Sequence, residues 1–334
     1  MRSAVAAVRR WLPVVLPVVA LLVAALVPVW IGGRRGFGLG TTAVIAAVLA
    51  LGYQVTYGFS GQLSVAHAPL QGIGAYAIAN LTTTSGWSFW SSLPLAVVLA
   101  ALVGAVVGLP GLRVRGDVLA LVTLGAGEIL QALYLNTERF TQGSDGIAGI
   151  PPVTVLGRAV DHRGLYAVAL GLGLVTLLAV GAMRHSPLGR AWLAARDDEV
   201  AAQAFAVPVG RLRLLAFAVG AGIAGLAGAL YAVQDRFVSS VSFGLGQTVI
   251  VILVVLVAGE ARIGRTVAAA IAMTVLVDRL TPYGQVSEGV TGLLILAVVA
   301  VRLGLLVAAR ARVVTWLRLA HQWAGRRRAL AGAG

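Results

Sequence analysis

Apolar residues along this chain fall into blocks separated by short polar stretches that are rich in Arg and Gly. The blocks are roughly 20 residues long, which is the helix length that crosses a ~30 Å hydrocarbon core. The pattern predicts an all-α, polytopic transmembrane helical bundle of about ten spans, one of them an interrupted helix. The predicted spans are residues 11–31, 38–57, 62–82, 90–110, 117–136, 164–183, 213–235, 245–260, 264–281 and 288–307.

Composition agrees with a membrane protein, because 59% of the 334 residues are hydrophobic and only 11% are charged. Soluble domains average about 25% charged residues. The net charge of +14 comes from Arg alone, and these Arg residues lie mainly between the apolar blocks. With the N-terminus in the cytoplasm, 19 of them fall in inside segments and seven in outside segments. This bias predicts that both termini are cytoplasmic, and it favours topology over nucleic-acid binding as the reason for the charge.

Three regions result from this topology. Residues 1–37 form an N-terminal helix and connection, residues 38–307 the transmembrane domain, and residues 308–334 a basic cytoplasmic tail. The first apolar block exceeds the core of about 7–15 residues that is typical of a signal peptide, so we expect it to be retained. The two long connections, 137–163 outside and 184–213 inside, are too short for a separate domain.

Several classes of chemistry are excluded by what the sequence lacks. There is no Lys, so a phosphate-binding loop of the G-x-x-x-x-G-K-[ST] type cannot form. There is no Cys, and the four His residues are scattered rather than set at metal-ligand spacing. We therefore expect no catalytic residue, metal or cofactor in this chain. If ATP is used, it must be hydrolysed by a separate subunit.

The stretch "GFSGQLSVAHAPLQGIGAY", residues 58–76, places polar side chains within a potential membrane span. They are Ser60, Gln62, Ser64, His67 and Gln71. Polar groups at membrane depth generally face the protein interior or a water-filled cavity, and Pro69 with its neighbouring Gly residues favours a break in the helix. Broken helices often line substrate paths in transporters. The stretch is predicted to be such an interrupted helix, with a polar helix–helix interface as the alternative.

Two further features of the spans leave alternatives open. Glu128 lies about midway in the span 117–136, where a lipid-facing carboxylate would be unfavourable by about 2.5–3.5 kcal/mol. It either lines the pathway or is a structural acid bonded to a neighbouring helix. Small residues recur at four-residue spacing and allow close packing, either within this chain or against a second subunit. They are Gly220, Ala224 and Gly228, and Ala100, Gly104 and Gly108.

The inside connection reads "RHSPLGRAWLAARDDEVAAQAFAVPVGRLRLLAF". Ser186 and Pro187 predict the start of one short helix, and Asp197 or Asp198 the cap of a second one that ends before Pro208. The apolar face of the second helix consists of Val200, Ala201, Ala204 and Phe205. Such a face needs something to cover it. Three consecutive acids disfavour anionic lipid headgroups, so a protein partner fits better.

The stretch from residue 58 and this connection, together with "LRVRGDVLALVTLGAGEI", "QGSDGI" and "LLAFAVGAGIAGLAGALYA", resemble the inner-membrane permeases of branched-chain amino acid ABC transporters. The likeness is to the longer of the two paired permeases and spans about residues 52–302. Two departures stand out: Ala206 replaces a usual Gly, and "VLVAGEARIGRTVAAAI" replaces a Gly-rich turn near Glu260.

The resemblance implies a subunit of an ATP-driven importer in the bacterial inner membrane, not an enzyme. Its partners would be a second homologous permease, two ATPase subunits that carry ATP and magnesium, an extracytoplasmic substrate-binding protein and membrane lipid, but no nucleic acid. The helix after Asp198 would be the coupling helix that docks into the ATPase. The residues that match it are Asp197, Asp198, Glu199, Ala201 and Ala202, with Phe205 as the apolar anchor. Alternatives are a urea or short-amide importer, or a proton-coupled carrier that uses Glu128 and His67.

Overall fold

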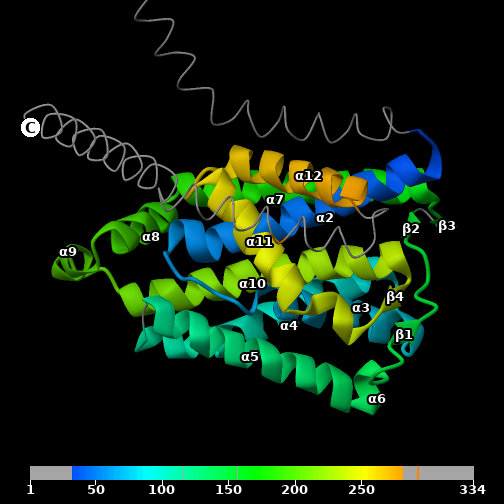
Figure 1. Ribbon diagram of the computed structural model, residues 1–334, viewed down its shortest axis with the longest axis horizontal. Coiled ribbons are helices and arrows are strands. Elements are labelled where there is room, and N and C mark those ends of the chain that lie inside the picture. Colours follow the sequence, from blue (N-terminus) through cyan, green and yellow to red (C-terminus); the bar gives the residue numbers. More distant parts are fainter. Residues whose placement is uncertain (1–31, 115, 156, 281–291, 293–334) are drawn as a thin grey trace, which may run out of the picture. The chain divides into compact units, whose positions relative to one another are not determined.

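The computed structural model describes residues 32–280, except residues 115 and 156, together with residue 292 (Figure 1). Residues 32–279 belong to one compact unit. The predicted span 11–31, the predicted span 288–307 apart from residue 292, and the predicted basic tail lie outside the described residues.

The described chain is almost entirely helical, which confirms the predicted all-α class. The helices are α2 (Gly33–Tyr53), π-helix η1 (Gln54–Phe59), α3 (His67–Thr83), α4 (Phe89–Gly108), η2 (Leu109–Leu112), α5 (Gly116–Asn136), α6 (Glu138–Thr141), α7 (His162–His185), α8 (Pro187–Asp197), α9 (Glu199–Ala204), α10 (Val209–Asp235), η3 (Ser240–Phe243), α11 (Leu245–Ala258) and α12 (Ile263–Leu280). Two short antiparallel pairs join β1 (Ile147–Ala148) to β4 (Phe237–Val238) and β2 (Thr154–Val155) to β3 (Arg158–Ala159).

Six segments of the described chain are long and apolar enough to cross a membrane. They are Gly33–Phe59, Phe89–Leu112, Val118–Asn136, His162–His185, Val209–Asp235 and Ser240–Ala258. Each coincides with a predicted span to within a few residues. Two other predicted spans are also helical, but α3 has only 17 residues and the 18 residues of α12 include three charged ones.

Helix α10 is the centre of the bundle and packs against α2, α3 and α4 (Figure 1). The contacts are close because both surfaces carry small residues. A Cβ added at Gly74 would collide with the backbone of Gly225, and one added at Gly104 would collide with the Cβ of Ala221. The small-residue faces of α4 and α10 therefore pack against each other and against α3 within this chain, which resolves one of the alternatives left open by the sequence.

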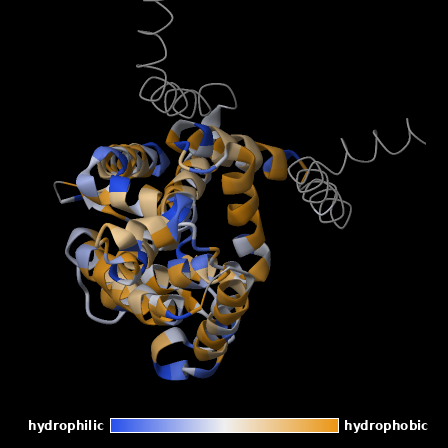
Figure 2. Ribbon diagram, turned by 90° about the vertical axis from the view of Figure 1, so that its left-hand side faces the viewer, coloured by the Kyte–Doolittle hydropathy of each residue, from blue (hydrophilic) through white to orange (hydrophobic). Residues whose placement is uncertain are grey.

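The outward faces of α4, α5 and α7 are mainly apolar, as membrane-spanning helices require. Leu102, Leu121 and Val175 are each more than half exposed on these helices. Figure 2, which faces the end of the molecule that carries α8 and α9, shows hydrophobic residues on the outward faces of several helices. We call this end the α8–α9 end, and the opposite one, where the strands lie, the strand end (Figure 1).

Candidate functional site

The predicted helix interruption is present, but it lies earlier than Pro69 suggested. Helix α2 runs into the π-helix η1, and residues 61–66 are not helical. Helix α3 then begins at His67 and continues without a break to Thr83. Pro69 is the third residue of α3, within the first turn, where a missing amide donor leaves no helical hydrogen bond unmade. The expectation that Pro69 breaks the helix was therefore wrong.

The irregular backbone between η1 and α3 is satisfied by the protein itself. The backbone amide of Gln62 donates to the carbonyl oxygen of Thr56 at 3.1 Å. Its side-chain amide donates to the Ser60 hydroxyl at 2.8 Å and to the carbonyl oxygen of Arg213 at 2.9 Å. The amide of Val65 donates to the Thr123 hydroxyl at 3.0 Å. These bonds meet the requirement that non-helical backbone inside a membrane protein finds partners in the protein. Ser60 and Gln62 thus lie at the α8–α9 end and hold the connection to α10.

Ser64 and His67 lie deeper and are completely buried. The His67 ring meets the edge of the Tyr53 ring, with 5.2 Å between centroids. It sits where α2 and α10 approach, beside Gly52 and Gly220. In this structure, Ser64 and His67 are therefore part of the packing between helices.

Gln71, by contrast, lines a cavity of about 270 Å³. The side chain is buried, and its Oε1 has no hydrogen-bond partner among the described residues. The other polar lining residues are Thr42, Tyr231, Gln234, Asp235, Ser242 and Gln247. Sequence reasoning missed this group, because its members come from four segments and no single span looks unusually polar.

Glu128 lies on the exposed side of α5. Gly125, one turn earlier, has open space where a Cβ would be. Among the described residues, α5 packs mainly against α3 and otherwise presents an apolar face. The six predicted pathway residues are therefore divided among the α8–α9 end, the buried helix crossing, the polar cavity and the open face of α5.

The α8–α9 loop, residues 186–208, is held in place by specific contacts with the rest of the protein. Ser186 caps α8 by accepting a bond from the amide of Gly189, and Pro187 is its first residue, as predicted. Trp192 is fully buried, and its Nε1 donates to the carbonyl oxygen of Leu212 at 2.7 Å. The Trp192 ring also stacks on the Phe59 ring, with 6.4 Å between the ring centroids. Helix α8 is therefore anchored to both η1 and the start of α10.

The second predicted helix, α9, is also present with its predicted cap. Asp198 accepts a hydrogen bond from the amide of Ala201 at 3.0 Å. Glu199 forms an ion pair with Arg213 at 2.6 Å, and both side chains are about 15% exposed (14% and 16%). Ala202 faces inward and packs with Ala195. Two of the three acids and Ala202 thus hold α9 in place.

The opposite face of α9 is open. Val200 and Phe205 are 76% and 84% exposed, and Ala201 and Ala204 are exposed between them. Ala206, directly after the helix, has φ = 58°, a left-handed conformation that favours Gly. A Gly, which the family resemblance leads us to expect at this position, would adopt this backbone conformation without strain.

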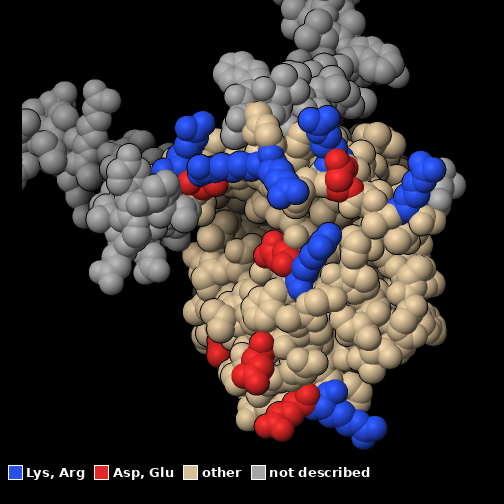
Figure 3. Space-filling view, turned by 90° about the vertical axis from the view of Figure 1, so that its right-hand side faces the viewer, with Lys and Arg blue, Asp and Glu red and all other residues tan. Residues whose placement is uncertain are grey.

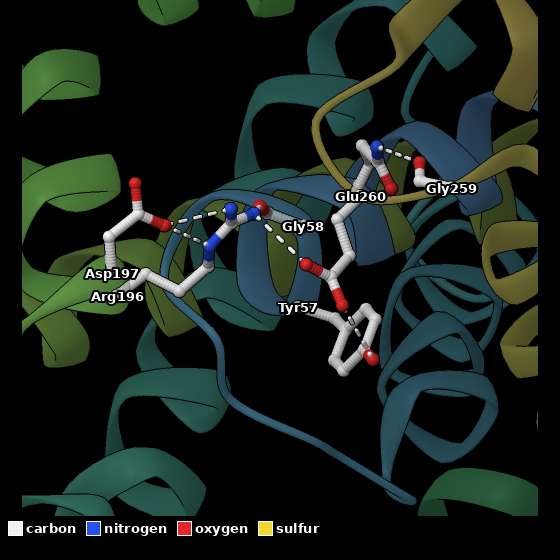
Figure 4. Close-up of polar contacts among 7 residues, drawn as sticks. Tyr57, Gly58, Arg196, Asp197, Gly259 and Glu260 are labelled. Atoms are coloured by element: carbon white, nitrogen blue, oxygen red, sulfur yellow. Dashed lines mark hydrogen bonds and ion pairs between the residues drawn. The ribbon is translucent and has the colours of Figure 1, made fainter. Parts of the chain in front are cut away.

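Arg196, at the end of α8, is the centre of a polar cluster at the same end (Figure 4). Its Nη1 donates to the carbonyl oxygen of Gly58 at 2.5 Å and lies 3.4 Å from a carboxylate oxygen of Glu260. Its Nη2 lies 2.9 Å from Asp197. Glu260 also accepts a bond from the Tyr57 hydroxyl at 3.3 Å. Sequence reasoning missed the contact between Arg196 and Glu260, although Glu260 lies in a segment that departs from the usual turn.

At the strand end, basic and acidic side chains are interspersed (Figure 3). A cavity of about 440 Å³ opens there, and its charged lining residues include Arg34, Asp161 and Arg236. Among the residues that the structure describes, no group of His, Asp or Glu could hold a metal ion.

Comparison with known proteins gives a consistent result. The family model described as "Branched-chain amino acid transport system / permease component" matches residues 37–301. The high-affinity branched-chain amino acid transport system permease protein LivM of Escherichia coli K12 is 35% identical over 80% of this chain and 69% of its own length. The autoinducer 2 import system permease protein LsrC of Enterobacter sp. strain 638 is 29% identical over 69% of this chain and 65% of its own length. The high-affinity branched-chain amino acid transport system permease protein LivH of E. coli K12 is 26% identical over 59% of this chain and 68% of its own length. No solved structure was found to match the chain.

Proposed function

Since the chain belongs to the branched-chain amino acid transport system permease family, we propose that it is the membrane subunit of an ATP-driven importer of branched-chain or related amino acids. The observation that carries the proposal is the α8–α9 loop. It is held rigidly by Trp192, Asp198 and the Glu199–Arg213 ion pair, yet it leaves the apolar face around Phe205 uncovered. A rigid loop with an exposed apolar anchor suits docking to a separate ATPase subunit.

In this proposal the α8–α9 end is cytoplasmic, the strand end is extracytoplasmic, and both termini are inside after ten spans. Two ATPase subunits carry ATP and magnesium and dock on α9. A second homologous permease covers the open face of α5, so that Glu128 faces that subunit or the water-filled path between the two. The charged strand end receives the substrate-binding protein, which delivers the amino acid.

Two residues of this chain are candidates for lining the substrate path. Gln71 lines the polar cavity toward the strand end, and Glu128 lies on the open face of α5. Cys placed at residue 128 or 71 should react with a small water-soluble thiol reagent in at least one nucleotide state of the assembled transporter. Cys at residue 67 is the buried control. Protection of residues 128 and 71 in every state, in a complex that transports, would remove them from the path.

A proton-coupled carrier is the competing class, and it would use Glu128 and His67. His67 is completely buried, and neither ring nitrogen has a hydrogen-bond partner among the described residues. A proton relay needs a chain of hydrogen-bond donors and acceptors. The surroundings of His67 do not supply one among the described residues, and this favours the ATP-driven importer.

The decisive test is purification from native membranes, with identification of co-purified subunits and reconstitution in liposomes. Uptake should require ATP, the second permease and the loaded binding protein. Leucine, urea and a short amide, each offered on its binding protein, would separate an amino acid importer from a urea or amide importer. Uptake by this chain alone, driven by a proton gradient, would overturn the proposal.

A further inference from the structure

We propose that Arg196 is a positioning residue that transmits displacement of the α8–α9 loop to the ends of α2 and α11. The inference rests on the proposed function, since it concerns how ATP-driven movement of the docked loop would reach the membrane helices. It is carried by the arrangement of Arg196, Gly58 and Glu260 in Figure 4.

The Arg196 guanidinium joins three elements that are distant in the sequence. Arg196 belongs to the last turn of α8, Gly58 to η1 at the end of α2, and Glu260 to the turn between α11 and α12. The bonds to the Gly58 carbonyl oxygen and the Glu260 carboxylate both come from Nη1, at 2.5 Å and 3.4 Å. Because one nitrogen contacts both partners, a shift of α8 acts on Gly58 and Glu260 together.

The backbone around Arg196 is shaped to receive its side chain. Gly61 has φ = 72°, and a Cβ there would lie 2.7 Å from the Cγ of Arg196. The side chain of Arg196 is therefore laid across Gly61 with only 23% of its surface exposed. This contact gives a reason for Gly at position 61, which makes room for the Arg196 side chain, whereas a Cβ at Gly58 would instead meet the side chain of Gln54 at 2.6 Å.

The two elements that receive Arg196 are also bonded to each other. The Gln54 amide, in η1, donates to the carbonyl oxygen of Gly259 at 3.1 Å. The Tyr57 hydroxyl, also in η1, donates to Glu260. The end of α2 and the α11–α12 turn thus form one body, and Arg196 connects that body to α8.

Arg196 is separate from the groups that fold the loop. Trp192 anchors α8, and the pair of Glu199 and Arg213 anchors α9, without using Arg196. Glu260 is about half exposed (48%), so its ion pair adds little to stability. Loss of Arg196 should therefore leave the loop folded and able to dock. It should weaken the transmission of loop displacement to the ends of α2 and α11.

The test compares Arg196→Gln with Arg190→Gln in the complete reconstituted transporter. Arg190 lies on the same helix and, within the part of the chain that the structure describes, donates to the carbonyl oxygen of His185 alone. Three quantities are measured: ATPase affinity, ATP hydrolysis, and the number of substrates imported per ATP. Arg196→Gln should keep the affinity within about twofold but lower the number imported per ATP by about fivefold or more, the lower end of typical coupling between sites. Arg190→Gln should match the wild type.

Glu260→Gln gives a second variant if Arg196→Gln does not fold, with thermal unfolding as the control for both. It should lower the number of substrates per ATP in the same direction but less, since the bond to Gly58 remains. Unchanged substrates per ATP in a folded Arg196→Gln transporter would overturn the proposal. Loss of ATPase affinity would overturn it too, because Arg196 would then belong to the docking surface. Absence of ATP-driven uptake by the wild type would instead contradict the proposed function.

Discussion

Gly228 of α10 lies directly against the carbonyl oxygen of Gln71 in α3, so closely that a Cβ at residue 228 has no space. The contact fixes the crossing of the two helices at the level where Gln71 reaches the polar cavity. The separation of these two backbones therefore decides both the packing of the bundle and the position of a candidate pathway residue.

Replacement of Gly228 by Ala should destabilise the protein, because backbone rather than a flexible side chain occupies the place of the new methyl group. Overpacking of this kind is unfavourable by about 1–3 kcal/mol or more. Thermal unfolding in detergent is the measurement. Gly171→Ala, in α7, is the matched control, since a Cβ there would point into open space. Equal unfolding temperatures for the two variants would show that α3 and α10 are not packed as described.

Replacement of Phe205 by Ala should leave the permease folded but weaken ATPase docking by at least about tenfold, or roughly 1.4 kcal/mol. The side chain is 84% exposed and contributes little to the fold, whereas large apolar anchors commonly dominate interfaces. A pull-down with titrated ATPase measures the affinity. Val241→Ala, an equally exposed residue outside the α8–α9 loop, is the control. An unchanged affinity in Phe205→Ala would exclude this side chain from the interface.

Replacement of Glu199 by Gln should loosen α9 itself, because it breaks an ion pair with Arg213 that is largely shielded from water. Hydrogen bonds to charged groups contribute about 1.5–3 kcal/mol, so faster proteolysis of the α8–α9 loop is expected. Asp197→Asn should have a much smaller effect, since Asp197 is mostly exposed. If both variants resisted protease like the wild type, the ion pair with Arg213 would not be what holds α9 in place.

Replacement of Ala206 by Gly should stabilise the end of α9, because the residue has φ = 58°. A residue with a Cβ is destabilised by about 1 kcal/mol in the left-handed conformation, and Gly avoids this penalty. The greater freedom of Gly in the unfolded chain offsets part of the gain. Hydrogen exchange of residues 199–207 should slow. Ala204→Gly, inside the helix, should accelerate it. Faster exchange in Ala206→Gly would mean that the backbone there is not left-handed.

The helices and their caps could be predicted from the sequence because they depend on local patterns. Apolar blocks located the membrane helices, and Ser186 and Asp198 marked the starts of α8 and α9. Pro69 misled the prediction because the first turn of a helix tolerates proline. The contact between Arg196 and Glu260 could not be predicted, because it joins residues far apart in sequence whose approach depends on how α8 packs on the bundle.

The π-helix η1 places a constraint on the number of residues in this part of the chain as well as on their identity. A π-turn accommodates an extra residue within an otherwise regular helix. Deletion of one residue between Gln54 and Phe59 would remove this extra residue and let the stretch wind as a regular α-helix, so the wider turn that η1 forms would be lost. The contacts that Gln54, Tyr57 and Gly58 make with their neighbours therefore depend on the length of this stretch and not only on these three residues.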